Sequence, residues 1–252
     1  MAPPFWTVGN PVIADDQAMP AMNDGTNGKS QAMKVISLNV GRPRLVVDRG
    51  REVSTGIFKS PVDGPVMLRQ TNFDGDRQAD LSVHGGVNKA VYAYPSEHYE
   101  YWRGELPGVE LTWANFGENL TTEGLLESDA RVGDQFRIGG AVLRVAQPRL
   151  PCFKLGIRFG RDDMVKRFLA SGRSGIYFSV VAEGLVQAGD TIELLERDER
   201  GITIADVNRA YAHSRENLDL LRHIIALEIL PPGLHGDFVE RLASLEARTV
   251  EA

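Results

Sequence analysis

The sequence predicts a mainly β domain followed by a small bundle of three helices. From about residue 34 to 197, short apolar runs alternate with Gly, Pro, Asp and Asn turns, which is typical of a β-barrel or a sandwich. After Gly201 the apolar residues recur every three or four positions, which indicates amphipathic helices. We therefore expect an N-terminal extension over 1–33, a β domain over 34–197 and a helical domain over 198–252.

The first segment lacks a folding pattern. Residues 1–33 contain many Pro, Gly, Asn, Asp and Met residues and show no sustained apolar periodicity. Such a composition buries too little apolar surface to offset the entropy of ordering the chain. We expect a flexible extension, or an upstream start ahead of Met33.

Eight strands are expected in the β domain, because their residues are apolar or β-branched and turn residues separate them. The Gly139-Gly140 pair between two of them predicts a two-residue hairpin. The eight expected strands cover 34–40, 56–58, 66–69, 91–94, 135–138, 141–146, 176–181 and 191–195.

Five helices are expected, and four of them have a residue that can cap the N-terminus. Ser96 and Asp162 begin the two helices that interrupt the strands, and Thr203 and Ser214 begin the first two helices of the tail. The Pro231-Pro232-Gly233 break precedes the third. Each tail helix has its own apolar stripe, so the three are expected to form a separate bundle.

Composition and charge exclude several classes of protein. The formal net charge is −6, with no basic stripe, so we expect no nucleic acid polymer as partner. No apolar run approaches the roughly 20 residues that span a bilayer, and no secretory signal is visible, so we expect no membrane partner. With a single cysteine there is no internal disulfide, and a cytoplasmic location is expected.

That cysteine, Cys152, has unusual neighbours. Pro148 and Pro151 restrict the backbone around it, and Arg149 and Lys154 favour the thiolate. A thiolate attacks electrophiles or binds a soft metal. The alternative is a buried structural thiol that packs as a small apolar group.

The sequence does not contain a complete set of metal ligands. One cysteine cannot close a structural zinc site, and the histidines at 84, 98, 213, 223 and 235 show no ligand spacing. In the acidic stretch 74–86, Ala79 occupies the position where a calcium loop needs glycine, so we reject such a loop. A metal at Cys152 would need most of its ligands from an organic cofactor.

Several stretches together resemble the MOSC domain, which is named for the C-terminal domain of molybdenum cofactor sulfurase. The bacterial branch that reduces N-hydroxylated purines and gives resistance to 6-N-hydroxylaminopurine is the most similar. The tail resembles the three-helix domain often appended in this branch. The matching stretches are 57–62, 80–86, 90–95, 116–120, 132–134, 147–155, 175–177 and 205–208, within a similarity that covers about 34–246.

The resemblance implies a MOSC β-barrel that binds a molybdopterin-type molybdenum cofactor. It identifies Cys152 as the catalytic residue, whose thiolate is the ligand of molybdenum. It also implies that Lys59, His84, Asn119 and Arg149 bind the cofactor, Lys59 near its phosphate. For Lys59, His84 and Arg149 the alternative is a role in the barrel alone.

The implied reaction is reduction of N–OH to N–H in a small N-hydroxylated substrate, as in detoxification of N-hydroxylated bases. No flavin or nicotinamide motif is present, so electrons are expected from a separate reductase, for which the tail is a candidate docking surface. One alternative is a carrier that stores or delivers molybdopterin or passes sulfur through Cys152. Another is a thiol enzyme without metal.

Overall fold

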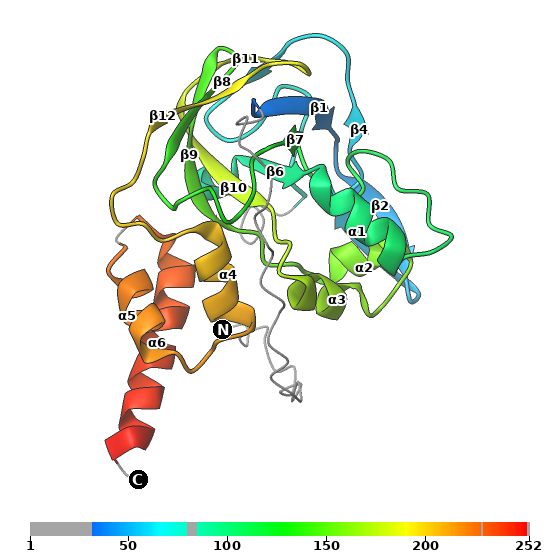
Figure 1. Ribbon diagram of the computed structural model, residues 1–252. Helices are drawn as coiled ribbons and strands as arrows, with labels where there is room; N and C mark the ends of the chain where they lie inside the picture. Colours follow the sequence, from blue (N-terminus) through cyan, green and yellow to red (C-terminus); the bar gives the residue numbers. More distant parts are fainter. Residues whose placement is uncertain (1–31, 80–84, 228, 251–252) are drawn as a thin grey trace. The chain divides into compact units, whose positions relative to one another are not determined.

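The computed structural model describes residues 32–79, 85–227 and 229–250, which contain one large sheet and the helices around it (Figure 1). The sheet has eight strands in the spatial order β12-β8-β9-β10-β6-β7-β1-β4. Its strands are β1 (Lys34–Val40), β4 (Ser60–Pro61), β6 (Val91–Pro95), β7 (Leu120–Glu123), β8 (Gln135–Ile138), β9 (Ala141–Pro148), β10 (Ile176–Ala182) and β12 (Ile192–Glu196). The expected mainly β class is confirmed.

Hydrogen bonds between distant segments close this sheet into a barrel. β6 and β7 pair in parallel, and the other neighbouring strands of the sheet pair antiparallel. At the open edge, Lys34 forms a bridge with Thr191, directly before β12. There Ile192 N donates to Met33 O over 2.8 Å. The expected Gly139-Gly140 hairpin joins β8 to β9, with Ile138 opposite Ala141.

Two smaller sheets include strands that the sequence analysis missed. β2 (Arg44–Asp48) and β3 (Arg51–Thr55) form a hairpin, and β5 (Val66–Leu68) pairs with β11 (Gly184–Val186). The hairpin exposes apolar and charged side chains alike, with Leu45 66% and Val47 73% exposed, so its sequence lacks the one-sided pattern of a buried strand. β7 was also missed. The expected strand over 56–58 is wrong, because these residues form no ladder pairs.

The helices are α1 (Glu97–Glu105), α2 (Phe153–Phe159), α3 (Met164–Ser171), α4 (Ile204–Ala212), α5 (Leu218–Ile225) and α6 (Pro232–Val250), with a short 3₁₀ helix η1 (Val87–Lys89). None of the helices in the described residues is long and apolar enough to cross a membrane. α2 was not expected, because its seven residues contain a glycine and follow a proline closely.

Two of the expected helix caps are correct and two are wrong. Ser96 directly precedes α1 as expected, although its side chain makes no capping hydrogen bond, and Thr203 forms a capping box with Asp206 at the start of α4. α3 begins after Asp163 rather than Asp162. α5 begins after Asn217, whose side chain accepts from Leu220 N over 3.0 Å, whereas the expected cap Ser214 still bonds through its N–H to the end of α4.

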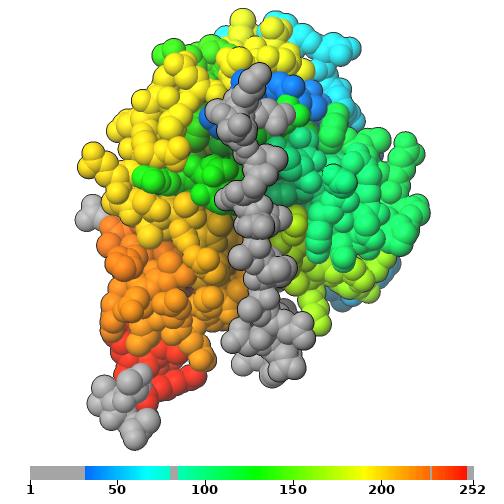
Figure 2. Space-filling model, viewed as in Figure 1, coloured from blue at the N-terminus to red at the C-terminus, as the bar shows by residue number. Residues whose placement is uncertain are grey.

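One hydrophobic cluster fills the barrel and continues into the tail helices. Leu38 and Val145 of the barrel belong to the same cluster as Val207, Ile224 and Phe238 of the tail. In Figure 2 the orange surface of the tail helices follows the yellow surface of the preceding strands without a gap. The three tail helices form the expected C-terminal helical unit, and its apolar residues are continuous with the barrel core. The domain limits at 34, 197 and 198 stay predictions, and residues 1–31 lie outside the described residues.

Candidate functional site

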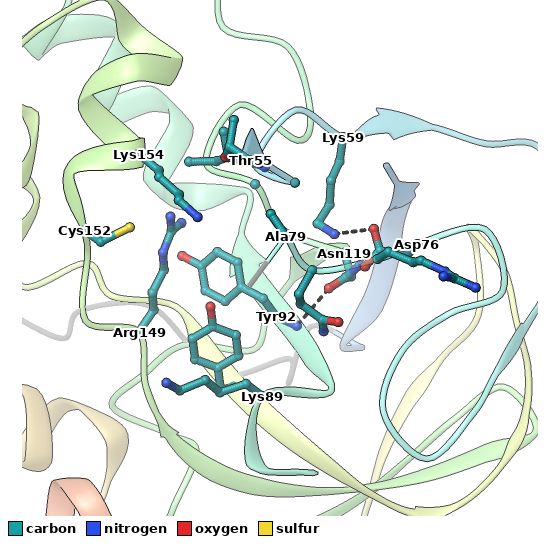
Figure 3. Close-up of a pocket in the computed structure, with 16 residues that line it drawn as sticks. Thr55, Lys59, Asp76, Ala79, Lys89, Tyr92, Asn119, Arg149, Cys152 and Lys154 are labelled. Atoms are coloured by element: carbon teal, nitrogen blue, oxygen red, sulfur yellow. Dashed lines mark hydrogen bonds and ion pairs between the residues drawn. The ribbon is translucent and has the colours of Figure 1, made fainter. Parts of the chain in front are cut away.

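A pocket at one end of the barrel brings together residues from distant parts of the chain (Figure 3). Its wall combines the end of β3, the loop after β5, the strands β6 and β10, and the segment between β9 and α2. The pocket is lined by Thr55, Gly56, Ile57, Lys59, Asp76, Arg77, Gln78, Ala79, Lys89, Tyr92, Gly117, Asn119, Arg149, Cys152, Lys154 and Tyr177. Four of the five predicted site residues are in this set.

Cys152 reaches the pocket from the turn between β9 and α2. Its backbone is extended, with φ −119° and ψ 173°, and it directly precedes the first turn of α2. Its carbonyl accepts from Leu155 N over 2.9 Å, which fixes the turn. The side chain is half-buried and points to the pocket in Figure 3. The preceding Pro151 limits the backbone, so the thiol has a defined position.

Lys59 forms an ion pair with Asp76 inside the pocket. The Lys59 side chain is 8% exposed and that of Asp76 is 1% exposed, so both charges are largely removed from water. Burial lowers the pKa of Lys59 below its ordinary value, and the adjacent Asp76 carboxylate opposes that shift. Asp76 Oδ1 also accepts from Gly41 N over 2.8 Å. Gly41 is required here, because a Cβ would lie 2.5 Å from Phe58 O.

Asn119 lies beside this pair, with every amide atom bonded inside the protein. Its Nδ2 donates to Asp76 Oδ2 over 2.9 Å and to Asn39 O over 3.3 Å. Its Oδ1 accepts from Tyr92 N over 3.2 Å. Asn119 therefore orients Asp76, and through it Lys59, while its contact with a cofactor stays a prediction.

Arg149 is 7% exposed and lies against the aromatic side of the pocket. Its guanidinium is 4.7 Å from the centre of the Tyr92 ring and 5.6 Å from that of Phe168. Its Nη1 donates to Phe116 O. A guanidinium held in this way keeps its charge and a fixed direction.

The turn that supplies this carbonyl is organised by the buried Glu118. The carboxylate accepts from Ala114 N over 2.9 Å, from Phe116 N over 3.1 Å and from Thr121 Oγ1 over 3.0 Å. It also accepts from the Tyr99 hydroxyl. Burial raises the pKa of Glu118, and these hydrogen bonds oppose the shift. The sequence placed this turn near the site but did not indicate that Glu118 holds it.

Positive charge predominates in the pocket. Burial lowers the pKa of Lys89, an effect that the nearby Cys152 opposes. Among the described residues of the lining, Asp76 is the acid and is paired with Lys59, so the set of cations fits a bound anion. The cations of the lining are Lys59, Arg77, Lys89, Arg149 and Lys154.

Sequence reasoning missed Asp76, Lys89, Tyr92 and Tyr177 as members of this site. Asp76 belonged to the acidic stretch in which a calcium loop was rejected, and nothing local indicated that it meets Lys59. Tyr92 lay within a matching stretch, although no role was assigned to it. The predicted His84 lies outside the described residues, as do its neighbours 80–83.

No group of three metal-ligating side chains occurs among the residues that the structure describes. Cys152 is the only sulfur ligand of its kind in the sequence. A soft metal bound there would take its other ligands from a bound organic group. The thiol, the five cations and the buried aromatic wall fit a planar anionic cofactor with sulfur ligands.

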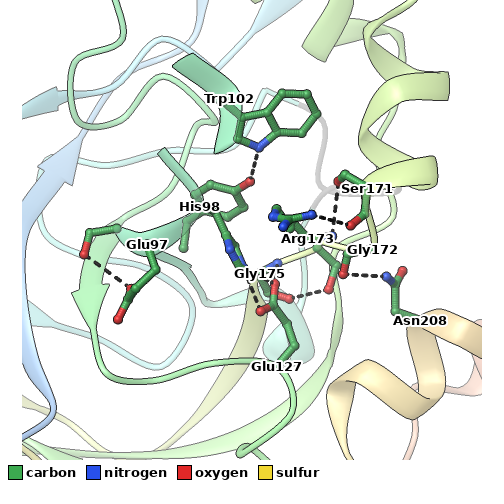
Figure 4. Close-up of polar contacts among 12 residues, drawn as sticks. Glu97, His98, Trp102, Glu127, Ser171, Gly172, Arg173, Gly175 and Asn208 are labelled. Atoms are coloured by element: carbon green, nitrogen blue, oxygen red, sulfur yellow. Dashed lines mark hydrogen bonds and ion pairs between the residues drawn. The ribbon is translucent and has the colours of Figure 1, made fainter. Parts of the chain in front are cut away.

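A polar network outside the pocket fixes the loop that supports Tyr92 (Figure 4). The Tyr92 hydroxyl donates to Ser174 O over 2.9 Å. The next residue, Gly175, donates its N–H to Glu127 over 2.6 Å. Glu127 also bonds to His98 Nε2 over 2.8 Å. Burial raises the pKa of Glu127, but His98 and the Gly175 N–H together lower it by more, so its pKa lies below the ordinary value.

The tail contacts this same loop. Asn208 of α4 donates to Gly172 O over 3.0 Å, and Gly172 ends α3 in a left-handed conformation. Ala205 N of α4 also donates to Glu127 O over 3.0 Å. The loop then leads directly into β10 and Tyr177, so α4 is connected to the pocket wall through these hydrogen bonds and a short segment of chain.

Comparison with known proteins agrees with this architecture. Residues 80–193 match the family model of the MOSC domain, and residues 202–245 match that of the YiiM-like 3-alpha helix domain. YflK of Bacillus subtilis (strain 168) is 42% identical over 213 residues, which are 84% of this chain and 96% of that protein. The crystal structure of YiiM from Geobacillus stearothermophilus has a TM-score of 0.70 and 35% identity, covering 83% of this chain and 99% of that one.

A third relative is a much longer protein. The protein named "Reductase" of Gibberella moniliformis (strain M3125 / FGSC 7600) is 37% identical over 175 residues. These residues are 68% of this chain but 31% of the fungal protein. Most of that protein therefore has no counterpart here.

Proposed function

Because this chain belongs to the MOSC-domain family, with a YiiM-like three-helix domain after the barrel, we propose that it is a molybdenum-cofactor-dependent reductase of N-hydroxylated compounds. The observation that supports the proposal most is the meeting of Cys152 with five cations in one pocket. A thiolate suits molybdenum, and the cations suit the phosphate of a molybdopterin. The name of the fungal relative agrees with an oxidoreductase role.

The proposed reaction breaks one N–O bond. R–NH–OH, two electrons and two protons give R–NH₂ and water. When bound, the molybdenum cofactor supplies the two-electron redox centre for this step. Cys152 would hold the metal through its thiolate, and Lys59, oriented by Asp76, would bind an anionic part of the cofactor. Arg149 would keep a fixed positive charge beside them.

The electrons are proposed to come from a separate reductase. The matched part of the fungal protein leaves most of that longer chain without a counterpart here. The alternative function is a carrier of molybdopterin or of sulfur, which the half-buried and reachable Cys152 also favours. A carrier would bind the cofactor at the same cations but would have no turnover.

The test is Cys152→Ser in protein produced with the molybdenum cofactor. Serine offers a harder oxygen than sulfur, so we expect turnover of an N-hydroxylated purine with a chemical reductant to fall by roughly a hundredfold or more, with the melting temperature kept. Molybdenum content is measured on the same samples. Normal turnover with full molybdenum in the serine variant would contradict the assignment. Loaded wild type that reduces no N-hydroxylated compound, yet passes its cofactor to an apo-enzyme, would identify a carrier.

A further inference from the structure

A second, smaller hollow adjoins the main pocket. It is lined by Lys89, Gln147, Pro148, Leu150 and Tyr177. Lys89 and Tyr177 also line the main pocket, so the two hollows share one wall. Among the described residues, its lining includes one cation, Lys89, and the other members are neutral. It therefore differs in chemistry from the strongly cationic pocket beside it.

Gln147 is the unusual member of this lining. It lies near the end of β9, opposite Tyr177 of β10, and is 4% exposed. Among the described residues, its side-chain amide takes part in no hydrogen bond. Neither amide atom is among the fully buried polar atoms that lack a partner, so both amide atoms keep some accessible surface. Buried polar groups in proteins are nearly always hydrogen-bonded. The Gln147 amide, unlike that of Asn119, is thus available to a molecule in the hollow.

From this arrangement we propose that Gln147 binds the heterocyclic edge of the substrate, an inference that rests on the proposed function. A primary amide presents a donor and an acceptor side by side, which matches a ring nitrogen next to an N–H group. The Tyr177 ring, Pro148 and Leu150 supply apolar surface for a flat ring. The N-hydroxylated purine of the proposed function has such adjacent donor and acceptor atoms on its ring edge, so the new assignment is the residue that binds this edge.

The geometry also assigns the two hollows different occupants. The thiol and most of the cations face the main pocket, where an anionic cofactor would lie. A neutral amide adds little to the binding of a phosphate but can discriminate strongly between ring edges, because a wrong edge leaves buried polar atoms unpaired. Gln147 is therefore a specificity-determining residue rather than a cofactor ligand.

The test uses Gln147→Met in the full-length, cofactor-loaded protein, because methionine has a similar length and no amide. Adenine, the product expected from 6-hydroxylaminopurine, is titrated by calorimetry. We expect its Kd to rise at least tenfold, which corresponds to about 1.4 kcal/mol. The KM for 6-hydroxylaminopurine should rise similarly, whereas that for N-phenylhydroxylamine, whose ring has no nitrogen, should change less than twofold. Gln187→Met, in an exposed turn, is the matched control.

The outcomes separate this proposal from the function on which it rests. Equal adenine affinity in Gln147→Met and wild type would overturn the subsite, and so would loss of molybdenum from the variant, since Gln147 would then hold the cofactor. If wild type reduces no N-hydroxylated compound, the adenine titration still decides the subsite independently. If the methionine variant fails to fold, Gln147→Glu, which removes the donor, is expected to weaken adenine binding in the same way.

Discussion

Replacing Asp76 with asparagine tests how the site holds its buried lysine. Asp76 Oδ1 accepts from Gly41 N and from Lys59, and Oδ2 accepts from Asn119. Asparagine has nearly the same shape but only one acceptor oxygen and no charge. The substitution therefore leaves Lys59 without its counter-charge in a position where its side chain is 8% exposed.

The expected loss follows from these contacts. Breaking a buried ion pair from one side costs about 3–5 kcal/mol, because the remaining charge stays buried without compensation. The new amide N–H₂ would also face Asn119 Nδ2, a second donor. Asn119 cannot rotate to relieve this without losing its bond from Tyr92 N. We expect Asp76→Asn to lower the free energy of unfolding by about 3 kcal/mol.

A double-mutant cycle, with unfolding in urea, measures the interaction free energy between Lys59 and Asp76. Lys59→Met alone leaves Asp76 with two N–H donors, from Gly41 and Asn119, so we expect a smaller loss of about 2 kcal/mol. The double variant should be more stable than the sum of the single changes predicts by about 2 kcal/mol. Asp74→Asn is the matched control, because its side chain is 54% exposed and pairs with Arg69 at the surface.

Additive effects within about 0.5 kcal/mol would refute the reasoning, because they would mean that Lys59 and Asp76 do not depend on each other. Molybdenum content measures the part that Lys59 plays in cofactor binding. Lys59→Met should reduce cofactor occupancy by about tenfold or more at limiting cofactor, since it removes a charge-assisted bond.

Two further predictions concern the supports of the pocket. Because the pKa of Glu127 is lowered in the folded state, its stabilising contribution is present above about pH 4.3 and is lost as the pH falls through the folded-state pKa. The unfolding free energy of wild type should therefore fall more steeply between about pH 5 and 3 than that of Glu127→Gln. Glu100→Gln, at an exposed position of α1, should match wild type, and equal slopes for Glu127→Gln and wild type would contradict the pairing. Gly117→Ala should destabilise by about 2 kcal/mol in thermal unfolding, because φ is +77° and the new Cβ would lie 2.8 Å from Ile57 Cγ1. Gly104→Ala, which meets nothing within 4 Å in α1, should be neutral or stabilising; equal effects at the two glycines would disprove the strain argument.

The elements that the sequence predicted correctly are those whose pattern is local. β1 and β8 match their expected limits, because each is a run of strand-forming residues that ends at turn residues. The capping box at Thr203 is also a local signal. The β2–β3 hairpin was missed because both faces expose side chains. Closure of the barrel depends on Lys34 meeting Thr191, a contact between distant residues that no local pattern encodes.

The site shows the same division. Cys152, Lys59 and Arg149 were identified through their matching stretches, and all three line one pocket. The partner of Lys59 was not identified, because Asp76 reaches it only after the loop following β5 folds back. Asn119 was expected from the resemblance to bind the cofactor, whereas its amide is bonded within the protein.

Gln147 is the opposite case to Asn119, because the sequence did not predict it as a site residue. It lies in the same matching stretch as Cys152, but a glutamine on a strand is ordinary and gives no sequence signal. Two facts distinguish it, its burial and its amide without a partner among the described residues, and both depend on strands that meet only in the folded barrel.

The tail helices also acquire their role from tertiary contacts. About 50 residues bury too little apolar surface to form more than a marginal domain alone. The tail helices bury more by packing on the barrel core. The consequence is that removal of the tail would expose apolar side chains that this shared cluster buries. In a truncated chain, a loss of electron delivery could therefore not be distinguished from a loss of stability. Two hydrogen bonds connect α4 to the loop beneath Tyr92 and its support, one from Asn208 to Gly172 O and one from Ala205 N to Glu127 O. Substitution of Asn208 leaves the shared core in place, so it separates coupling between tail and pocket from loss of that core.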